Sequence, residues 1–341
     1  MREHPRSLDE FRGLFSEATD ARQWPHVATM VSYRRAIAEL ADHLGCAATE
    51  AAVFERRLAS PPDEYASALL RATGTEWLLL DDGFPPPDVA HGRERMAELA
   101  GCPSLPVLRI ERVDEEALTA TGELGEVRDR VRAEVAGARA SGHAALKTIA
   151  AYRTGLDVRL PSVEEAQSAL NAGARMNAKP LVDLLLWDAL EANAPDPLPV
   201  QVHTGFGDSD LLLPASDPAH LKVVIEAFPD TPFVLLHAYP YVREAGWLAH
   251  VYANVFFDLS LTIPHVARPA EAVRDALELA PVSKLLYASD AARAPELYFL
   301  AARRWRGALA TVLPESLPPG EAEHAARAIL RENALELYRL A

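Results

Sequence analysis

Short apolar runs alternate with longer amphipathic segments from about residue 75 to the end of the chain. Seven of these runs have the length and composition of buried strands: 77–80, 105–110, 144–150, 198–202, 232–236, 254–259 and 284–288. Amphipathic segments with helical spacing lie between most of them, for example 268–279 and 296–313. Strands that alternate with helices form parallel sheets covered by those helices, so the pattern predicts an α/β protein.

The first 75 residues lack such runs and predict helices instead. Segment 27–44 has helical periodicity and stops before Gly45, and Thr49 is suited to cap a second helix. A last amphipathic helix is predicted over 321–340. Seven strands come close to the eight of a (β/α)8 barrel, which is the architecture we predict, with a doubly wound open sheet as the alternative.

The chain length fits a single domain of this kind. Barrels often exceed the usual domain size, so we expect the 341 residues to form one unit. We divide it into a helical N-terminal insertion over 8–74, a barrel over 75–315 and a C-terminal helix over 316–341. Homo-oligomers are common among barrels, but no interface pattern is legible in the sequence.

Composition and charge exclude several classes of protein. Apolar residues make up 49% of the chain and charged residues 24%, as in ordinary globular proteins. A net charge of −15 opposes binding to nucleic acid or to an anionic membrane. No signal peptide, membrane span or glycine-rich phosphate loop is present, and Cys46 and Cys102 have no metal-site spacing. These features predict a cytoplasmic protein with a small-molecule substrate.

Polar residues follow several predicted strands at the point where each strand ends. His203 follows one strand, His237 the next, and Asp290 the last, while Lys147 lies within an earlier strand. The carboxyl ends of barrel strands meet at one rim, so these side chains are expected to converge there. Imidazoles and a carboxylate suit a divalent ion, most simply Zn²⁺, whose bound water is acidic enough for Asp290 to take its proton.

Lys147 draws attention because the chain has only four lysines against thirty arginines. Within an apolar strand it could be a structural ion-pair partner, or a buried amine whose neutral form reacts with CO₂ or a carbonyl. The remaining histidines fall in predicted helices or loops, and we interpret them as surface or packing residues: His4, His26, His43, His91, His220, His250, His265 and His324.

Several of these segments resemble a known family. The matching motifs are QVHTGFGDSD, VLLHAYPYVREAGWLA, NVFFDLS, LLYASDA, LKTIAAYRTGL and RENALELYRL. Together they resemble the amidohydrolase-2 branch of the metal-dependent amidohydrolase superfamily. Within it they are similar to the barrel domain that some fungal developmental and plant nodulin-like proteins fuse to a glutamine synthetase. The resemblance extends from about residue 5 to the C-terminus and is not specific for a substrate.

The resemblance implies roles for individual residues. His203 falls on a position that binds the metal, the catalytic His237 on one that binds the metal or contacts substrate, and Asp290 on a metal ligand that serves as general base. Lys147 falls where relatives place a bridging carboxylated lysine or another ligand. Three residues are expected to bind the substrate: Arg153, Tyr152 and Tyr239. The guanidinium of Arg153 suits bidentate binding of a carboxylate, and the two tyrosines would contact the substrate from the rim. Gly205 and Gly207 would let the loop backbone approach a ligand.

One departure from the family affects the metal site. The family begins with a strand that ends in His-x-His and supplies two ligands, whereas no such motif occurs here. We expect that strand either to be absent or to be encoded upstream of Met1, which would also explain a count of seven strands. Fewer ligands weaken metal binding, and an open barrel leaves two strand edges unpaired.

The predicted function is hydrolysis of a C–N bond, in an amide or related group, by a metal-activated water with Asp290 as general base. Two alternatives stay open. The same branch contains metal-dependent decarboxylases, and the missing His-x-His motif favours a metal-poor barrel that acts as a binding or regulatory module.

Overall fold

The computed structural model describes residues 3–81, 90–173, 176–292 and 294–340. Its centre is a sheet of seven parallel strands, each hydrogen-bonded to the next in sequence order. The strands are β1 (Leu78–Asp81), β2 (Ser104–Arg109), β3 (Ala145–Thr148), β4 (Val200–His203), β5 (Phe233–Leu236), β6 (Val255–Asp258) and β7 (Leu285–Leu286). All seven predicted strands are therefore confirmed.

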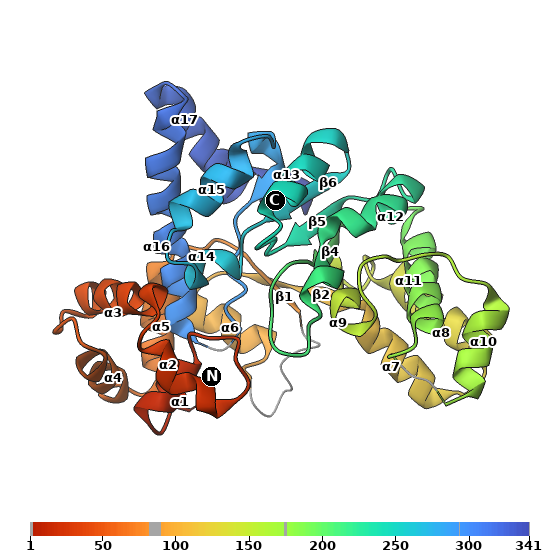
Figure 1. Ribbon diagram of the computed structural model, residues 1–341, viewed down its shortest axis with the longest axis horizontal. Coiled ribbons are helices and arrows are strands. Elements are labelled where there is room, and N and C mark those ends of the chain that lie inside the picture. The colour runs from red at the N-terminus through yellow and green to blue at the C-terminus, as the bar shows by residue number, and fades with distance from the viewer. Residues whose placement is uncertain (1–2, 82–89, 174–175, 293, 341) are drawn as a thin grey trace.

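The sheet curls into an open barrel (Figure 1). Its strand order never reverses, as it would in a doubly wound sheet, so that alternative is wrong. Within the described residues, β1 and β7 each pair on one side only, and the sheet does not close.

Helices surround the sheet, and apolar side chains on its outer face pack against them. Leu146, Val202 and Phe257 are almost completely buried in this layer. The helices after the first strand are α6 (Arg93–Ala100), α7 (Ile110–Ala120), α8 (Leu124–Gly137), α9 (Ala150–Arg153), α10 (Val163–Asn171), α11 (Lys179–Asn193), α12 (Lys222–Ala227), α13 (Val242–Val251), α14 (Thr262–His265), α15 (Pro269–Leu277), α16 (Pro295–Val312), α17 (Pro319–Arg327) and α18 (Asn333–Leu337).

The N-terminal region is helical, as predicted. It consists of α1 (Leu8–Gly13), α2 (Trp24–Val27), α3 (Val31–Leu44), α4 (Glu50–Leu58) and α5 (Pro62–Ala72). Gly45 ends α3 in the left-handed conformation, and the Thr49 hydroxyl caps α4. A buried ion pair between Arg57 and Glu296 joins these helices to α16, and Figure 1 shows them gathered at one end of that helix.

Side chains on the inner face of the sheet change character from floor to rim. Val234, Leu236 and Leu286 form an apolar floor against α18. The predicted last helix is interrupted there, because residues 328–332 form a π-helical turn between α17 and α18. Polar groups stand nearer the carboxyl ends of the strands, where they line a cavity of about 1070 Å³.

Two properties bear on the setting of the protein. In the part of the chain that the structure describes, no helix has the length and apolar character needed to cross a membrane. Cys46 and Cys102 are free thiols.

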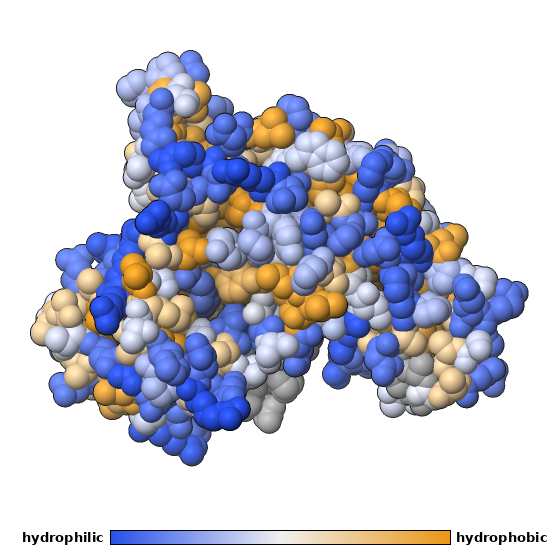
Figure 2. Space-filling model, viewed as in Figure 1, coloured by the Kyte–Doolittle hydropathy of each residue, from blue (hydrophilic) through white to orange (hydrophobic). Residues whose placement is uncertain are grey.

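On the face seen in Figure 2, apolar surface gathers near the middle, while the outlying helices carry mostly hydrophilic surface.

Candidate active site

His203 and His237 stand at the carboxyl ends of neighbouring strands. His203 is the last residue of β4, and His237 follows β5 directly. His237 has a φ of 68°, a left-handed conformation that is uncommon for residues other than glycine. The backbone is fixed on both sides, because His237 N–H donates to Asp258 at 2.8 Å and its carbonyl accepts from Thr262 at 2.7 Å.

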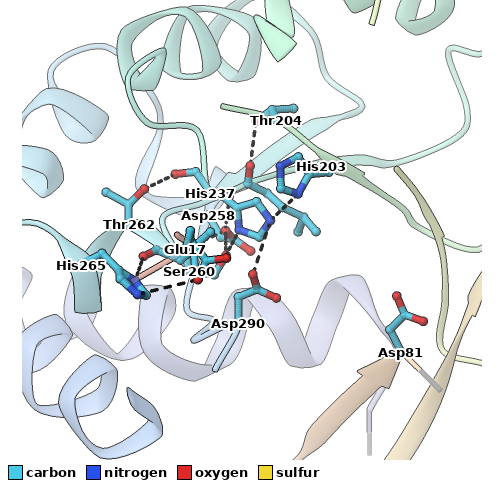
Figure 3. A network of polar contacts seen from close by, with 12 residues as sticks. Glu17, Asp81, His203, Thr204, His237, Asp258, Ser260, Thr262, His265 and Asp290 are labelled. Carbon is cyan, nitrogen blue, oxygen red and sulfur yellow. Dashed lines mark hydrogen bonds and ion pairs between the residues drawn. The ribbon is translucent and has the colours of Figure 1, made fainter. Parts of the chain in front are cut away.

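Three of the four side chains expected to converge at the rim lie close together, while Lys147 lines the same cavity and, within the described residues, forms no hydrogen bond or ion pair with them. His203 Nδ1 lies 3.0 Å from His237 Nε2, and Asp290 Oδ2 lies 3.7 Å from the same nitrogen (Figure 3). Asp290 follows β7 and also has a left-handed φ, of 49°. Both histidines are buried, whereas the Asp290 side chain is about one-third exposed to the cavity.

A hydrogen-bond relay determines where the protons of the two imidazoles lie. The Ser260 hydroxyl donates to Asp258 Oδ1 at 2.7 Å, so its oxygen accepts from Nδ1 of His237, also at 2.7 Å. His237 Nε2 is then a bare acceptor, and His203 Nδ1–H donates to it. His203 Nε2 remains a buried lone pair without a hydrogen-bond partner among the described residues.

Burial keeps these imidazoles neutral. It is the main cause that lowers the pKa of both His203 and His237 well below the usual value, and the nearby Lys147 charge acts in the same direction. Burial also raises the pKa of Asp258 to about 6, although three hydrogen bonds to its carboxylate oppose the shift. Neutral imidazoles can act as ligands or bases at neutral pH.

Lys147 lines the same cavity from β3, the strand next to β4, in a row of polar residues. Its register partners are Arg109 on β2 and Gln201 on β4, so the three side chains share the inner face of the sheet. Arg109 donates to Asp81 at 2.5 and 2.8 Å. Figure 3 shows Asp81 well apart from the histidines, at the end of β1.

Two of the three expected substrate-binding residues lie on α9. Tyr152 packs on the His203 ring with centroids 4.6 Å apart, and its hydroxyl accepts from Asp208 N–H at 3.2 Å. Burial raises its pKa above the usual value. Arg153 also lines the cavity, but it forms an ion pair with Glu115 at 2.6 Å. The third residue, Tyr239, is half-exposed on the rim.

The glycines after β4 allow close packing within the protein. Gly205 has a φ of 71°, and an added Cβ would lie 2.2 Å from the Tyr239 carbonyl oxygen. A Cβ on Gly207 would lie 1.7 Å from the Tyr152 hydroxyl. In this structure both therefore bring the loop close to other rim residues, and whether they also serve a ligand stays a prediction.

Sequence reasoning missed several residues of the site. Asp258 ends β6 and Ser260 follows two residues later, both within the NVFFDLS segment, and the signal that could have identified them was their place at a strand end, as for His203. His265 was interpreted as a surface or packing residue, yet its Nε2 lies 3.9 Å from Glu17, an N-terminal residue that lines the cavity. Arg109 falls within a predicted strand and Asp81 directly after one, and neither residue was singled out from the sequence.

The donor atoms fit a shared metal ion in part. Two donors bound to one zinc ion are typically about 3–3.5 Å apart, which agrees with the separation of His203 Nδ1 and His237 Nε2. Binding would displace the proton between them to His203 Nε2, the atom that now lacks a partner. Asp290 lies slightly outside this arrangement, and the described residues contain no group of three His, Cys, Asp or Glu side chains placed to hold an ion.

Fold and site together define an open α/β barrel with a pair of hydrogen-bonded imidazoles at its carboxyl rim. Sequence comparison matches residues 88–340 to the family described as amidohydrolase. The chain belongs to this family. It is also 38% identical over 218 residues to the protein fluG of Emericella nidulans, which covers 57% of this chain. The chain spans about a quarter of the length of that relative (25%).

Solved structures support the same assignment. A Lactobacillus casei protein assigned as a metal-dependent hydrolase has a TM-score of 0.87 and 29% identity, over 98% of this chain and 91% of that one. The uronate isomerase of Thermotoga maritima has a TM-score of 0.69 at 13% identity, over 99% and 89% of the two chains. An uncharacterised TIM-barrel protein from Bordetella bronchiseptica has a TM-score of 0.50 at 19% identity, over 89% of each chain. The last two show a shared fold only.

Proposed function

We propose that this protein is a metal-dependent hydrolase that cleaves a C–N bond in an amide or a related group. The observation that carries the proposal is the convergence of His203, His237 and Asp290 within one cavity, with separations of 3.0 and 3.7 Å between their polar atoms. Membership of the amidohydrolase family and the likeness to a metal-dependent hydrolase support it.

Each residue has a distinct part in the proposed reaction. His203 and His237 would hold a divalent ion, with Asp290 as the third donor after a small movement. Such an ion, most simply Zn²⁺, supplies Lewis-acid activation and lowers the pKa of water. Asp290 accepts the proton of the attacking water and returns it to the leaving nitrogen. The Asp258–Ser260 pair keeps the proton of His237 on Nδ1. The lone pair of His237 Nε2 would then be available to coordinate the ion.

The cavity accounts for the remaining requirements. Its volume of about 1070 Å³ is ample for a small molecule, and its floor is apolar. Tyr152 lines the cavity and would contact the substrate, as would Tyr239 from its half-exposed position after β5. We propose a cytoplasmic setting, which agrees with the two free cysteines.

The proposal is tested by elemental analysis of the purified protein together with a screen for hydrolysis of amides. We expect a divalent ion in the wild-type protein, lower metal content in His203→Ala and His237→Ala, and ammonia or amine release that a chelator abolishes. Release of CO₂ from a panel of carboxylic acids would instead identify a decarboxylase. Absence of both metal binding and turnover would overturn the proposal in favour of a binding module.

A further inference from the structure

Lys147 is a buried cation in the cavity wall. Only 9% of its surface is exposed, and its side chain lines the cavity from the middle of the polar row on β2, β3 and β4. Among the described residues, no hydrogen bond or ion pair involves its ammonium group. A lysine is rarely buried to this degree without a partner, because an unpaired buried charge is strongly unfavourable.

The neighbours of Lys147 do not supply the missing negative charge. On one side Asp81 receives two hydrogen bonds from Arg109 through a single oxygen, Oδ2. On the other side Gln201 is neutral, and its amide donates to the Tyr338 hydroxyl at 3.1 Å. Asp290 lies near the imidazoles and makes no ion pair with Lys147.

Lys147 is also close to the reacting end of the cavity. Its register partner Gln201 stands two residues before His203 on the neighbouring strand β4, and its positive charge contributes to the lowered pKa of both His203 and His237. A small ligand could therefore touch Lys147 at one end and the histidine pair at the other.

We propose that Lys147 binds a carboxylate of the substrate and thereby selects a monoanionic organic acid bearing the scissile group. This inference rests on the proposed function, since it names the substrate class for the same cavity. A single uncompensated ammonium matches the single charge of a carboxylate, whereas a phosphate dianion would require more cations. The Gln201 side chain adds a neutral polar group beside the same position.

Small acids and their amides test this proposal without knowledge of the substrate. Acetate, propionate and benzoate would be titrated into the full chain by calorimetry, each against the amide of the same shape. The titrations would be repeated after chelator treatment, which removes binding to a metal ion. We expect the acids to bind and the amides to bind at least about tenfold more weakly, as expected for a charge-assisted contact.

Three variants identify the group responsible. Lys147→Met keeps the length of the side chain without its charge and should weaken acid binding about tenfold or more. Lys147→Arg restores the charge and should bind within a few-fold of the wild type. Lys222→Met removes an exposed lysine that pairs with Glu226 and should change nothing.

Several results would overturn the proposal. One is equal affinity of the wild-type protein for acids and amides, a comparison that needs no variant and survives a folding defect in Lys147→Met. Another is unchanged acid binding in Lys147→Met. A third is a carbamate signal in the ¹³C NMR spectrum of wild-type protein treated with labelled bicarbonate, if Lys147→Met lacks that signal. Lys147 would then be carboxylated and negatively charged, and it could not bind a carboxylate. The protein could also bind acids but contain no metal and hydrolyse no amide. That result would support the carboxylate site at Lys147 and contradict only the proposed hydrolysis.

Discussion

The wall of the cavity formed by β5 and β6 and the wall formed by β2 and β3 both bury charged groups, but they stabilise them differently. On the first wall, Asp258 accepts hydrogen bonds from His237 N–H, Ser260 N–H and the Ser260 hydroxyl. On the second, Lys147 has no such partner among the described residues. The first wall is organised before a ligand arrives, whereas the second is completed by one.

This difference separates two kinds of function in one cavity. Groups that take part in bond cleavage gain from fixed positions and fixed proton locations, because reorganisation during the reaction raises the barrier. A group that selects a substrate gains from a charge that only the correct ligand compensates, because a ligand without that charge leaves it buried and unpaired. The following predictions test this comparison, beginning with the largest effect.

Asp290→Asn should have the largest effect on turnover. A general base typically contributes a factor of about 10² to 10⁴, so we expect hydrolysis to fall at least about 100-fold. Asparagine tolerates the left-handed backbone at this position, and the Asp290 side chain is about one-third exposed, so the unfolding free energy should change little. Activity within threefold of the wild type, measured on a substrate from the amide screen, would remove Asp290 from the reaction.

Ser260→Ala should remove the hydrogen-bond relay on the β5–β6 wall while keeping His203, His237 and Asp290. Asp258 loses a hydroxyl donor and His237 Nδ1 loses its acceptor, so we expect a loss of about 1–3 kcal/mol in denaturant unfolding. Nitrogen NMR of the imidazoles should show a mixture of His237 tautomers. Thr262→Val is the matched control, because it removes a hydrogen bond to the His237 backbone but leaves the relay. An unchanged tautomer in Ser260→Ala would contradict the relay.

Asp114 sharpens the comparison because it is a buried charge outside the cavity. It lies on α7 at 1% exposure, with one carboxylate oxygen unpartnered among the described residues, and burial raises its pKa well above the usual value. The folded state then binds its proton more tightly than the unfolded state. The stabilising contribution is complete below the unfolded pKa and is lost as the pH rises toward the folded pKa.

Asp114→Asn should therefore stabilise the protein at pH 8 by an amount on the order of 1 kcal/mol, with little gain at pH 4. Denaturant unfolding at the two pH values measures this difference. Asp129→Asn, at an exposed position on α8, should show none. If Asp114→Asn changes the unfolding free energy equally at both pH values, the folded protein does not stabilise Asp114 by protonating its carboxylate.

Arg153→Ala should have the smallest effect. Arg153 was predicted from the family resemblance to bind a carboxylate, but its guanidinium already pairs with Glu115 in a partly exposed position. Because Glu115 already compensates the Arg153 charge, we expect acid binding to weaken less than about threefold in Arg153→Ala. A greater loss than in Lys147→Met would transfer the role of carboxylate anchor from Lys147 to Arg153.

Local patterns were sufficient to predict the architecture and the convergence of three polar side chains at the rim. Seven apolar runs became seven strands, and the position of His203, His237 and Asp290 at strand ends brought them together because parallel strands share one rim. The pairing state of a buried charge is not local. Lys147 stands in an apolar run and Asp114 among other charged residues, and only the arrangement of distant segments shows that both are buried, one facing a cavity and the other a helix layer.

The relay and the interrupted last helix escaped prediction for similar reasons. Ser260 gained its role from a turn that directs its hydroxyl between Asp258 and His237, and no spacing rule indicates that turn. The segment 321–340 has an unbroken amphipathic pattern, so nothing in it marked a change of helical pitch at 328–332.

That change of pitch has a consequence for how the barrel tolerates insertions and deletions. A π-helical turn holds one residue more than an α-helical turn, and every side chain after it is rotated accordingly. Deleting one residue from 328–332 would turn α18 by roughly 100° about its axis. The hydrogen bond between Tyr338 and Gln201 would then be lost, and the apolar floor of the cavity would no longer be covered by the same side chains of α18. We therefore expect the packing of the cavity floor to depend on the number of residues in this segment.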